Sequence, residues 1–102
     1  MITIKNMDYS TPSHVFDVRV DRTTIFGNPF RIEDVSLRDD ALDRYRVYFY
    51  ERIKKDLDFR NEAEKLLRLY EKYGTLNLFC WCFPKRCHSE TIKEYIIERT
   101  KR

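Results

Sequence analysis

The sequence predicts a single small α/β domain, in which a short, mostly parallel sheet of about three strands is flanked by three helices in the order β-β-α-α-β-α. Three observations support this prediction. A chain of 102 residues that is 42% hydrophobic, with only 2 Gly and 3 Pro, can bury one modest core. Apolar and polar residues alternate near the N-terminus, and a continuous apolar run follows late in the chain. Helical periodicity dominates the middle and the C-terminal end.

Three segments have the composition of β-strands. Residues 2–5 and 14–20 alternate apolar and polar side chains, which is the period of a half-buried strand. The polar stretch between them contains Pro12 and predicts a turn or short loop. Residues 75–82 contain Leu76, Leu78, Phe79 and Trp81 without strong helix formers, which predicts a buried strand.

Three segments have helical periodicity. The first helix is expected to begin near Ser36, with Asp39 completing a capping box. Its predicted apolar face comprises Leu37, Ala41, Tyr45, Tyr48, Phe49 and Ile53. Residues 56–61 are expected to interrupt the helical region. A second helix then presents Ala63, Leu66, Leu67, Tyr70 and Tyr73 and ends before Gly74. The last helix is expected from residue 88 or 89 to about residue 100, with Ile92, Tyr95 and Ile96 facing inward.

The composition excludes several classes of protein. No apolar run approaches the ~18 residues of a membrane-spanning helix, and the first residues lack the layout of a signal peptide. We therefore expect a cytoplasmic protein that does not contact a membrane. The 20 Lys and Arg residues nearly balance the 17 Asp and Glu residues, which disfavours nucleic acid as the main partner. Three cysteines without a secretory signal argue against a disulfide framework.

The predicted topology brings two distant loops together. If the strands that end at Val20 and Cys82 are parallel neighbours, the helices between them form a right-handed crossover, and both following loops emerge at the carboxyl edge of the sheet. Ligands of open α/β sheets usually bind at that edge. This topology places Arg22 and residues 27–30 beside residues 80–88.

The loop of residues 27–30 has two interpretations. Gly27 permits a positive φ, and exposed backbone N–H groups with Arg22 and Arg38 would hold a phosphate or a carboxylate. Alternatively, the loop is only a turn, and Phe30 fills the core. Trp81 is similarly open to two interpretations, because its ring would either stack on a ligand or pack in the core.

The cysteine segment allows three interpretations. The four side chains Cys80, Cys82, Cys87 and His88 would form a tight Cys3His zinc site. Alternatively, the cysteines pack as small buried residues at the strand end. In the third interpretation Cys87 is a reactive thiolate, because it precedes a predicted helix and is flanked by Lys85, Arg86 and His88.

These motifs also carry a family resemblance. The resemblance rests on Arg22, Gly27-Asn28-Pro29-Phe30, Ser36-Leu37-Arg38, Tyr45-Arg46, Cys80-Trp81-Cys82-Phe83-Pro84 and Cys87-His88. With these motifs the chain resembles the family known as domain of unknown function 4326, over roughly residues 19–97. The family pattern commonly has Gly before the first Arg and Gly-Asp after the final His, where this chain has Asp21 and Ser89-Glu90. The resemblance implies a small α/β domain encoded by a phage, and it implies no established activity.

The leading hypothesis is that the carboxyl edge of the sheet binds, and in a stronger version processes, a small anionic ligand of the nucleotide type. Candidate ligand-binding residues are Arg22, Gly27, Asn28, Arg38, Trp81, Cys82, Lys85 and Arg86. Cys87 and His88 are the candidates for catalysis, although no carboxylate pair or Ser-His-Asp set indicates a reaction. One alternative is a zinc-stabilised domain without catalysis. Another is a phage protein that binds a host protein through an exposed apolar patch.

Overall fold

The computed structural model describes residues 1–29, 38–81 and 87–101. The elements in chain order are β1 (Ile2–Asn6), β2 (Asp17–Arg19), α1 (Arg38–Lys55), α2 (Leu57–Tyr73), β3 (Leu76–Cys80) and α3 (Ser89–Thr100). This order is the predicted β-β-α-α-β-α. The predicted fold class is therefore confirmed.

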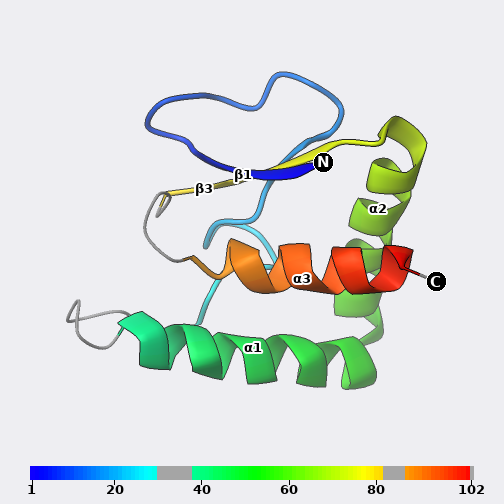
Figure 1. The fold of residues 1–102 in the computed structure, drawn as a ribbon. Helices are drawn as coiled ribbons and strands as arrows, with labels where there is room; N and C mark the ends of the chain where they lie inside the picture. The colour runs from blue at the N-terminus through cyan, green and yellow to red at the C-terminus, as the bar shows by residue number, and fades with distance from the viewer. Residues whose placement is uncertain (30–37, 82–86, 102) are drawn as a thin grey trace.

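The sheet has the strand order β1-β3-β2, and both pairs of neighbours are parallel. Ile2 pairs with Leu76 and Asn6 with Cys80, while Asp17 pairs with Asn77 on the other side of β3. The central strand β3 is buried at every position, as its apolar composition predicts. Figure 1 shows α1 and α3 on one side of the sheet and the loop between β1 and β2 on the other. The prediction that β2 and β3 are adjacent and parallel is confirmed.

Aromatic side chains form the centre of the core. Tyr45 and Phe49 of α1 are fully buried, as is Phe59 of α2. The Phe49 ring meets the ring of Phe59 edge-on at 5.3 Å and that of Tyr95 edge-on at 5.4 Å, a geometry that favours aromatic pairs. Leu76 and the other core residues of β3 pack against this cluster, so the three helices and the sheet share one core.

Strand β2 is shorter than the predicted strand of residues 14–20. Its first residue is Asp17, whose carboxylate accepts hydrogen bonds from the backbone N–H groups of Ser13 (2.9 Å) and His14 (3.0 Å). The other carboxylate oxygen accepts a hydrogen bond from the Asn77 side chain at 2.7 Å. These bonds hold residues 13–16 in a turn, so the alternation of apolar residues extends beyond the strand itself.

The predicted interruption at residues 56–61 is also wrong in extent, because Asp56 alone separates α1 from α2. Asp56 adopts an extended conformation, and its carboxylate caps α2 by accepting a hydrogen bond from the Phe59 N–H at 3.1 Å. At the other end of α2, Gly74 has the left-handed φ of 71° that a helix-ending glycine provides, as predicted. Tyr73 is exposed rather than part of the apolar face.

The predictions for β3 and α3 can be compared with the structure, whereas two predictions for residues 30–37 cannot. Strand β3 ends at Cys80 instead of Cys82, and Ile92, Tyr95 and Ile96 of α3 are buried as expected. The proposed cap at Ser36 and the core role of Phe30 lie outside the described residues.

A polar cluster joins α2 to α3. Glu64 of α2 accepts hydrogen bonds from the Tyr95 hydroxyl at 3.2 Å and from Arg99 at 2.5 Å, and Arg99 also donates to the Tyr95 hydroxyl at 2.6 Å. We call these three residues the Glu64 cluster. The cluster links the polar groups of three side chains whose apolar parts cover the core.

The outer surface of α1 is polar. Ion pairs one helical turn apart join Arg44 to Asp40 and Lys55 to Glu51. Neither α1 nor any other helix in the described ranges is both long enough and apolar enough to cross a membrane.

Candidate functional site

The ends of the three strands meet at the carboxyl edge of the sheet. The backbone N–H of Met7, just after β1, donates to the Cys80 carbonyl at 2.9 Å, and the Val20 N–H, just after β2, donates to the Phe79 carbonyl at 3.0 Å. The Asn6 side chain donates to the Trp81 carbonyl at 3.1 Å. The segments after all three strands therefore begin side by side, as the parallel topology requires.

Three further contacts join the loop after β2 to the start of α3, two of them through Tyr45 of α1. The Tyr45 hydroxyl of α1 donates to the Phe26 carbonyl at 2.7 Å, and the Tyr45 ring meets the His88 ring edge-on at 5.1 Å. The Nε2 atom of His88 is also hydrogen-bonded to the Val20 carbonyl. The loop after β2 therefore lies against His88 at Val20 and, through Tyr45, at Phe26. The predicted approach of residues 27–30 to His88 stays a prediction.

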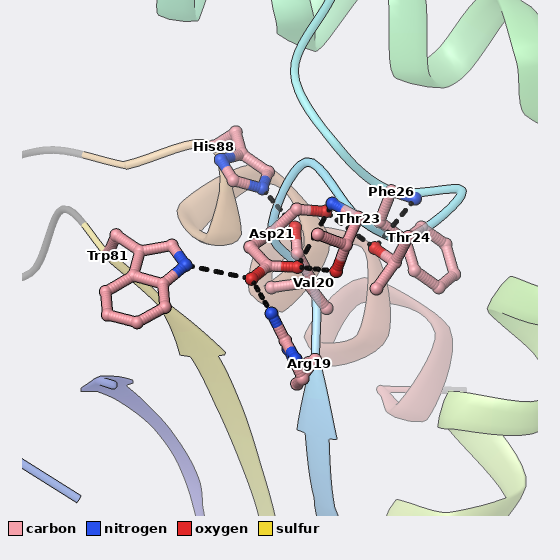
Figure 2. Close-up of polar contacts among 8 residues, drawn as sticks. All are labelled: Arg19, Val20, Asp21, Thr23, Thr24, Phe26, Trp81 and His88. Atoms are coloured by element: carbon pink, nitrogen blue, oxygen red, sulfur yellow. Dashed lines mark hydrogen bonds and ion pairs between the residues drawn. The ribbon is translucent and has the colours of Figure 1, made fainter. Parts of the chain in front are cut away.

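Asp21 is the hub of this edge, and Figure 2 shows the side chains that converge on it. Its Oδ2 atom accepts hydrogen bonds from the Trp81 indole N–H at 2.9 Å and from Arg19 at 2.5 Å. Its Oδ1 atom accepts bonds from the hydroxyl (2.6 Å) and the backbone N–H (3.2 Å) of Thr23. We call Arg19, Asp21, Thr23 and Trp81 the Asp21 cluster. The cluster joins residues that are 60 positions apart in sequence.

The donors around Asp21 fix its ionised state. Asp21 is only 3% exposed, and this burial by itself raises the pKa of the carboxyl. The hydrogen bonds from Arg19, Thr23 and Trp81 outweigh that effect and lower the pKa from 3.8 to about 2. Asp21 is therefore a carboxylate at neutral pH, and it orients the Trp81 ring through the indole N–H.

The backbone after Asp21 is tightly wound. The Asp21 carbonyl accepts bonds from the Thr24 N–H at 3.0 Å and the Thr24 hydroxyl at 2.8 Å, and the Gly27 N–H donates to the Thr24 carbonyl at 3.0 Å. A Cβ atom at Gly27 would lie 2.6 Å from the Arg22 Cα, which is too close for any other residue. Gly27 does not use the positive φ that a glycine permits, because among the described glycines only Gly74 has one. Gly27 is instead required for close approach of the backbone.

The candidate ligand-binding residues differ in accessibility. Arg22 is exposed, whereas the Asn28 side chain is buried. Trp81 is 50% exposed although its N–H group is hydrogen-bonded, so one of its two predicted roles, that of a core residue, does not apply. Arg38 is the first residue of α1, and nothing is described of its side chain. Cys82, Lys85 and Arg86 lie outside the described residues.

Cys80, Cys87 and His88 form a buried group. The two Sγ atoms lie 3.0 Å apart, and the Cys87 Sγ lies 3.5 Å from Nδ1 of His88 and 3.3 Å from the Ser89 hydroxyl. Burial lowers the pKa of His88 below its usual value of 6.5, with Arg22 adding to this effect, so the ring is neutral at pH 7. Because a carbonyl can only accept, the contact with Val20 assigns the proton to Nε2 and leaves the lone pair of Nδ1 directed at Cys87.

The predicted zinc ligands are only partly described. Within residues 1–29, 38–81 and 87–101, no group of three His, Cys, Asp or Glu side chains is arranged to hold a metal ion. Cys82, a member of the predicted Cys3His set, is outside these ranges. Cys80, Cys87 and His88 do form a contiguous set of sulfur and nitrogen atoms.

Sequence reasoning missed Asp21 as the hub of the edge. The available local signal was an Asp two residues before a Thr directly after a strand, a pattern typical of an Asx turn. Its bond to Trp81 has no local signal.

Comparison with known families agrees with this description. A family model, Domain of unknown function (DUF4326), matches residues 4–98. The chain belongs to this family. No curated protein and no solved structure matches the chain. The DUF4326 match covers β2 and β3 completely, β1 from Ile4 onward, and both segments that form the carboxyl edge, so the candidate site lies within the family domain.

Proposed function

We propose that the carboxyl edge of the sheet binds a small anionic ligand with a planar ring, such as a nucleotide. The observation that supports this proposal most directly is the fixed orientation and partial exposure of the Trp81 side chain. Its indole N–H is bonded to a buried carboxylate at 2.9 Å, while half of the side chain stays exposed at the edge. A large apolar ring whose orientation is fixed but whose surface is open is suited to stacking on a nucleobase.

Two arginines of the described residues lie at this edge and suit an anion. Arg22 directly follows Asp21 and is exposed, and Arg19 is partly exposed while it pairs with Asp21. An arginine that donates to a phosphate contributes typically ~1.5–3 kcal/mol to binding.

The proposal is one of binding rather than catalysis. Cys87 and His88 are within reach of each other, which is one requirement of a nucleophile and its base. Both side chains are buried, however, and the His88 ring is held against the Val20 carbonyl. Neither side chain is therefore open to a nucleotide at this edge, and we assign the pair no reaction on the bound ligand.

Trp81 also provides the readout, because it is the single tryptophan of the chain. Titration with the four nucleoside monophosphates should quench its fluorescence, whereas inorganic phosphate and the nucleosides should bind more weakly because each lacks one of the two contacts. Arg22→Ala should weaken binding about tenfold or more, the equivalent of one lost charge-assisted hydrogen bond.

The matched control is Arg68→Ala, which removes an exposed arginine from α2, away from the edge. Arg68→Ala should leave nucleotide affinity unchanged. If the Arg22→Ala and Arg68→Ala proteins bind nucleotide with equal affinity, Arg22 is not part of the binding site. Absence of binding of all four nucleotides by calorimetry would overturn the proposal.

A further inference from the structure

Cys80 and Cys87 are a pair of buried thiols in direct contact. Cys80 is the last residue of β3 and Cys87 lies two residues before the first residue of α3. Their Sγ atoms are 3.0 Å apart, about 1 Å longer than the ~2.05 Å of a disulfide bond. A small movement of either side chain would therefore bring the sulfurs to bonding distance.

The backbone around Cys87 is fixed by the first turn of α3. The Cys87 N–H donates to the Glu90 carboxylate at 3.0 Å, and the Glu90 N–H donates to the Cys87 carbonyl at 3.0 Å. These two bonds fix the Cys87 backbone at the positive end of the helix. The Cys87 sulfur is therefore held against Cys80.

Polar groups also surround the Cys87 sulfur. Nδ1 of His88 lies at 3.5 Å with its lone pair available, and the Ser89 hydroxyl lies at 3.3 Å. A proton acceptor and a hydroxyl beside a thiol favour its conversion to the reactive form. Cysteines that only fill a core need neither group.

We propose that Cys80 and Cys87 are a redox pair that closes a reversible disulfide when the protein meets hydrogen peroxide. Cys87 is 3% exposed and Cys80 is fully buried, so Cys87 is the sulfur that meets the oxidant. The inference is independent of the ligand proposed for the carboxyl edge.

The chemistry balances in two steps. The Cys87 sulfur attacks one peroxide oxygen, an S–O bond forms as the O–O bond breaks, and the departing hydroxide takes the thiol proton, through Nδ1 of His88, to leave as water. The Cys80 sulfur then attacks the Cys87 sulfenic acid, the S–S bond forms, and a second water leaves with the Cys80 proton. Two thiols are oxidised and one peroxide is reduced to two waters. Dithiothreitol reverses the change by thiol–disulfide exchange and is itself oxidised.

The test is peptide mapping of the whole protein after hydrogen peroxide treatment and alkylation under denaturing conditions. Trypsin cuts after Lys85 and Arg86, so Cys80 and Cys87 fall on different peptides. We expect these two peptides to be joined, with Cys82 alkylated, and to separate after dithiothreitol.

Cys82→Ser is the matched control, since it removes the neighbouring thiol and should leave the cross-link in place. Cys87→Ser should abolish it. Because the wild-type and Cys82→Ser proteins carry the decisive result, a folding defect of Cys87→Ser does not affect the test.

Three outcomes would overturn the proposal. One is a cross-link that disappears in Cys82→Ser, which would assign the bond to Cys82. Another is oxidation of Cys87 to the sulfinic acid without any cross-link. The third is stoichiometric zinc in the purified protein with all three thiols protected from peroxide, which would assign the cysteines to metal ligation.

Discussion

The Asp21 cluster and the Glu64 cluster use the same chemistry in two different regions. In each, a carboxylate accepts hydrogen bonds from an arginine and from the polar group of an aromatic side chain. In the Glu64 cluster the aromatic residue is the buried Tyr95, and both ends of the cluster are on helices that satisfy their own backbone bonds. In the Asp21 cluster the aromatic residue is half-exposed, and its partners come from segments that follow two strands. The first arrangement braces two helices, whereas the second holds an aromatic ring open to solvent.

The two carboxylates also differ electrostatically. Burial raises the pKa of both, and hydrogen bonds from Arg99 and Tyr95 then lower that of Glu64 below its usual value. Asp21 is more deeply buried and has donors on both oxygens, so its pKa falls further, to about 2. The folded state therefore depends more strongly on the charge of Asp21 than on that of Glu64.

The largest effect is expected from Asp21→Asn. The amide keeps the size of the side chain, but it loses the charge, and its nitrogen must face the donors on one side, either Arg19 and Trp81 or Thr23. We expect the free energy of unfolding to fall by roughly 2–3 kcal/mol, measured by urea denaturation. The emission of Trp81 should shift as well, because the indole N–H loses the charged acceptor that holds it. Unchanged emission would show that Asp21 does not orient the ring.

Most of the fold could be predicted from the sequence. The apolar composition of β3 indicates a buried strand, and a connection through two helices favours a parallel arrangement of β2 beside it. The start of β2 was not predictable in the same way. It depends on the Asp17 carboxylate, which bonds both to neighbouring backbone N–H groups and to Asn77, 60 residues away.

The candidate site was predictable in its place and less so in its contacts. Two neighbouring parallel strands end at the same edge of a sheet, so the segments after β2 and β3 lie close together for any side chains they carry. The contact between the segment after β2 and His88 therefore follows from the topology. Asp21 entered the sequence argument only as a departure from the family pattern. Its role arises from Trp81 and Arg19 converging on one carboxylate, and only one of these partners is near in sequence. Gly27 was singled out correctly, but for its φ rather than for its contact with Arg22.

The next largest effect is expected at low pH, where the stability contributed by the Asp21 cluster should be lost. The pKa of Asp21 is about 2 in the folded protein and near 3.8 in the unfolded chain, so the folded state releases this proton more readily. The stability that Asp21 contributes is fully present above about pH 4 and is lost as the pH falls toward 2. The loss amounts to about 2 kcal/mol, since one pKa unit corresponds to ~1.4 kcal/mol. Denaturation measured between pH 5 and pH 2 should therefore show a shallower decline in Asp21→Asn than in the wild type. Parallel declines in the two proteins would contradict the lowered pKa.

The smallest effect is expected from Glu64→Gln. The side chains of Glu64 and Arg99 are both partly exposed, so solvent screens their attraction. The glutamine oxygen can still accept a bond from Arg99 or Tyr95. We therefore expect a loss of about 1 kcal/mol in the free energy of unfolding. Trp81 emission should remain that of the wild type, because the bonds described for the Glu64 cluster join α2 to α3 and not to the strand ends. A Trp81 shift as large as that of Asp21→Asn would mean that the two clusters are coupled. The Glu64 cluster would then not act only on the packing of α2 against α3, and the Asp21 cluster would not alone orient Trp81.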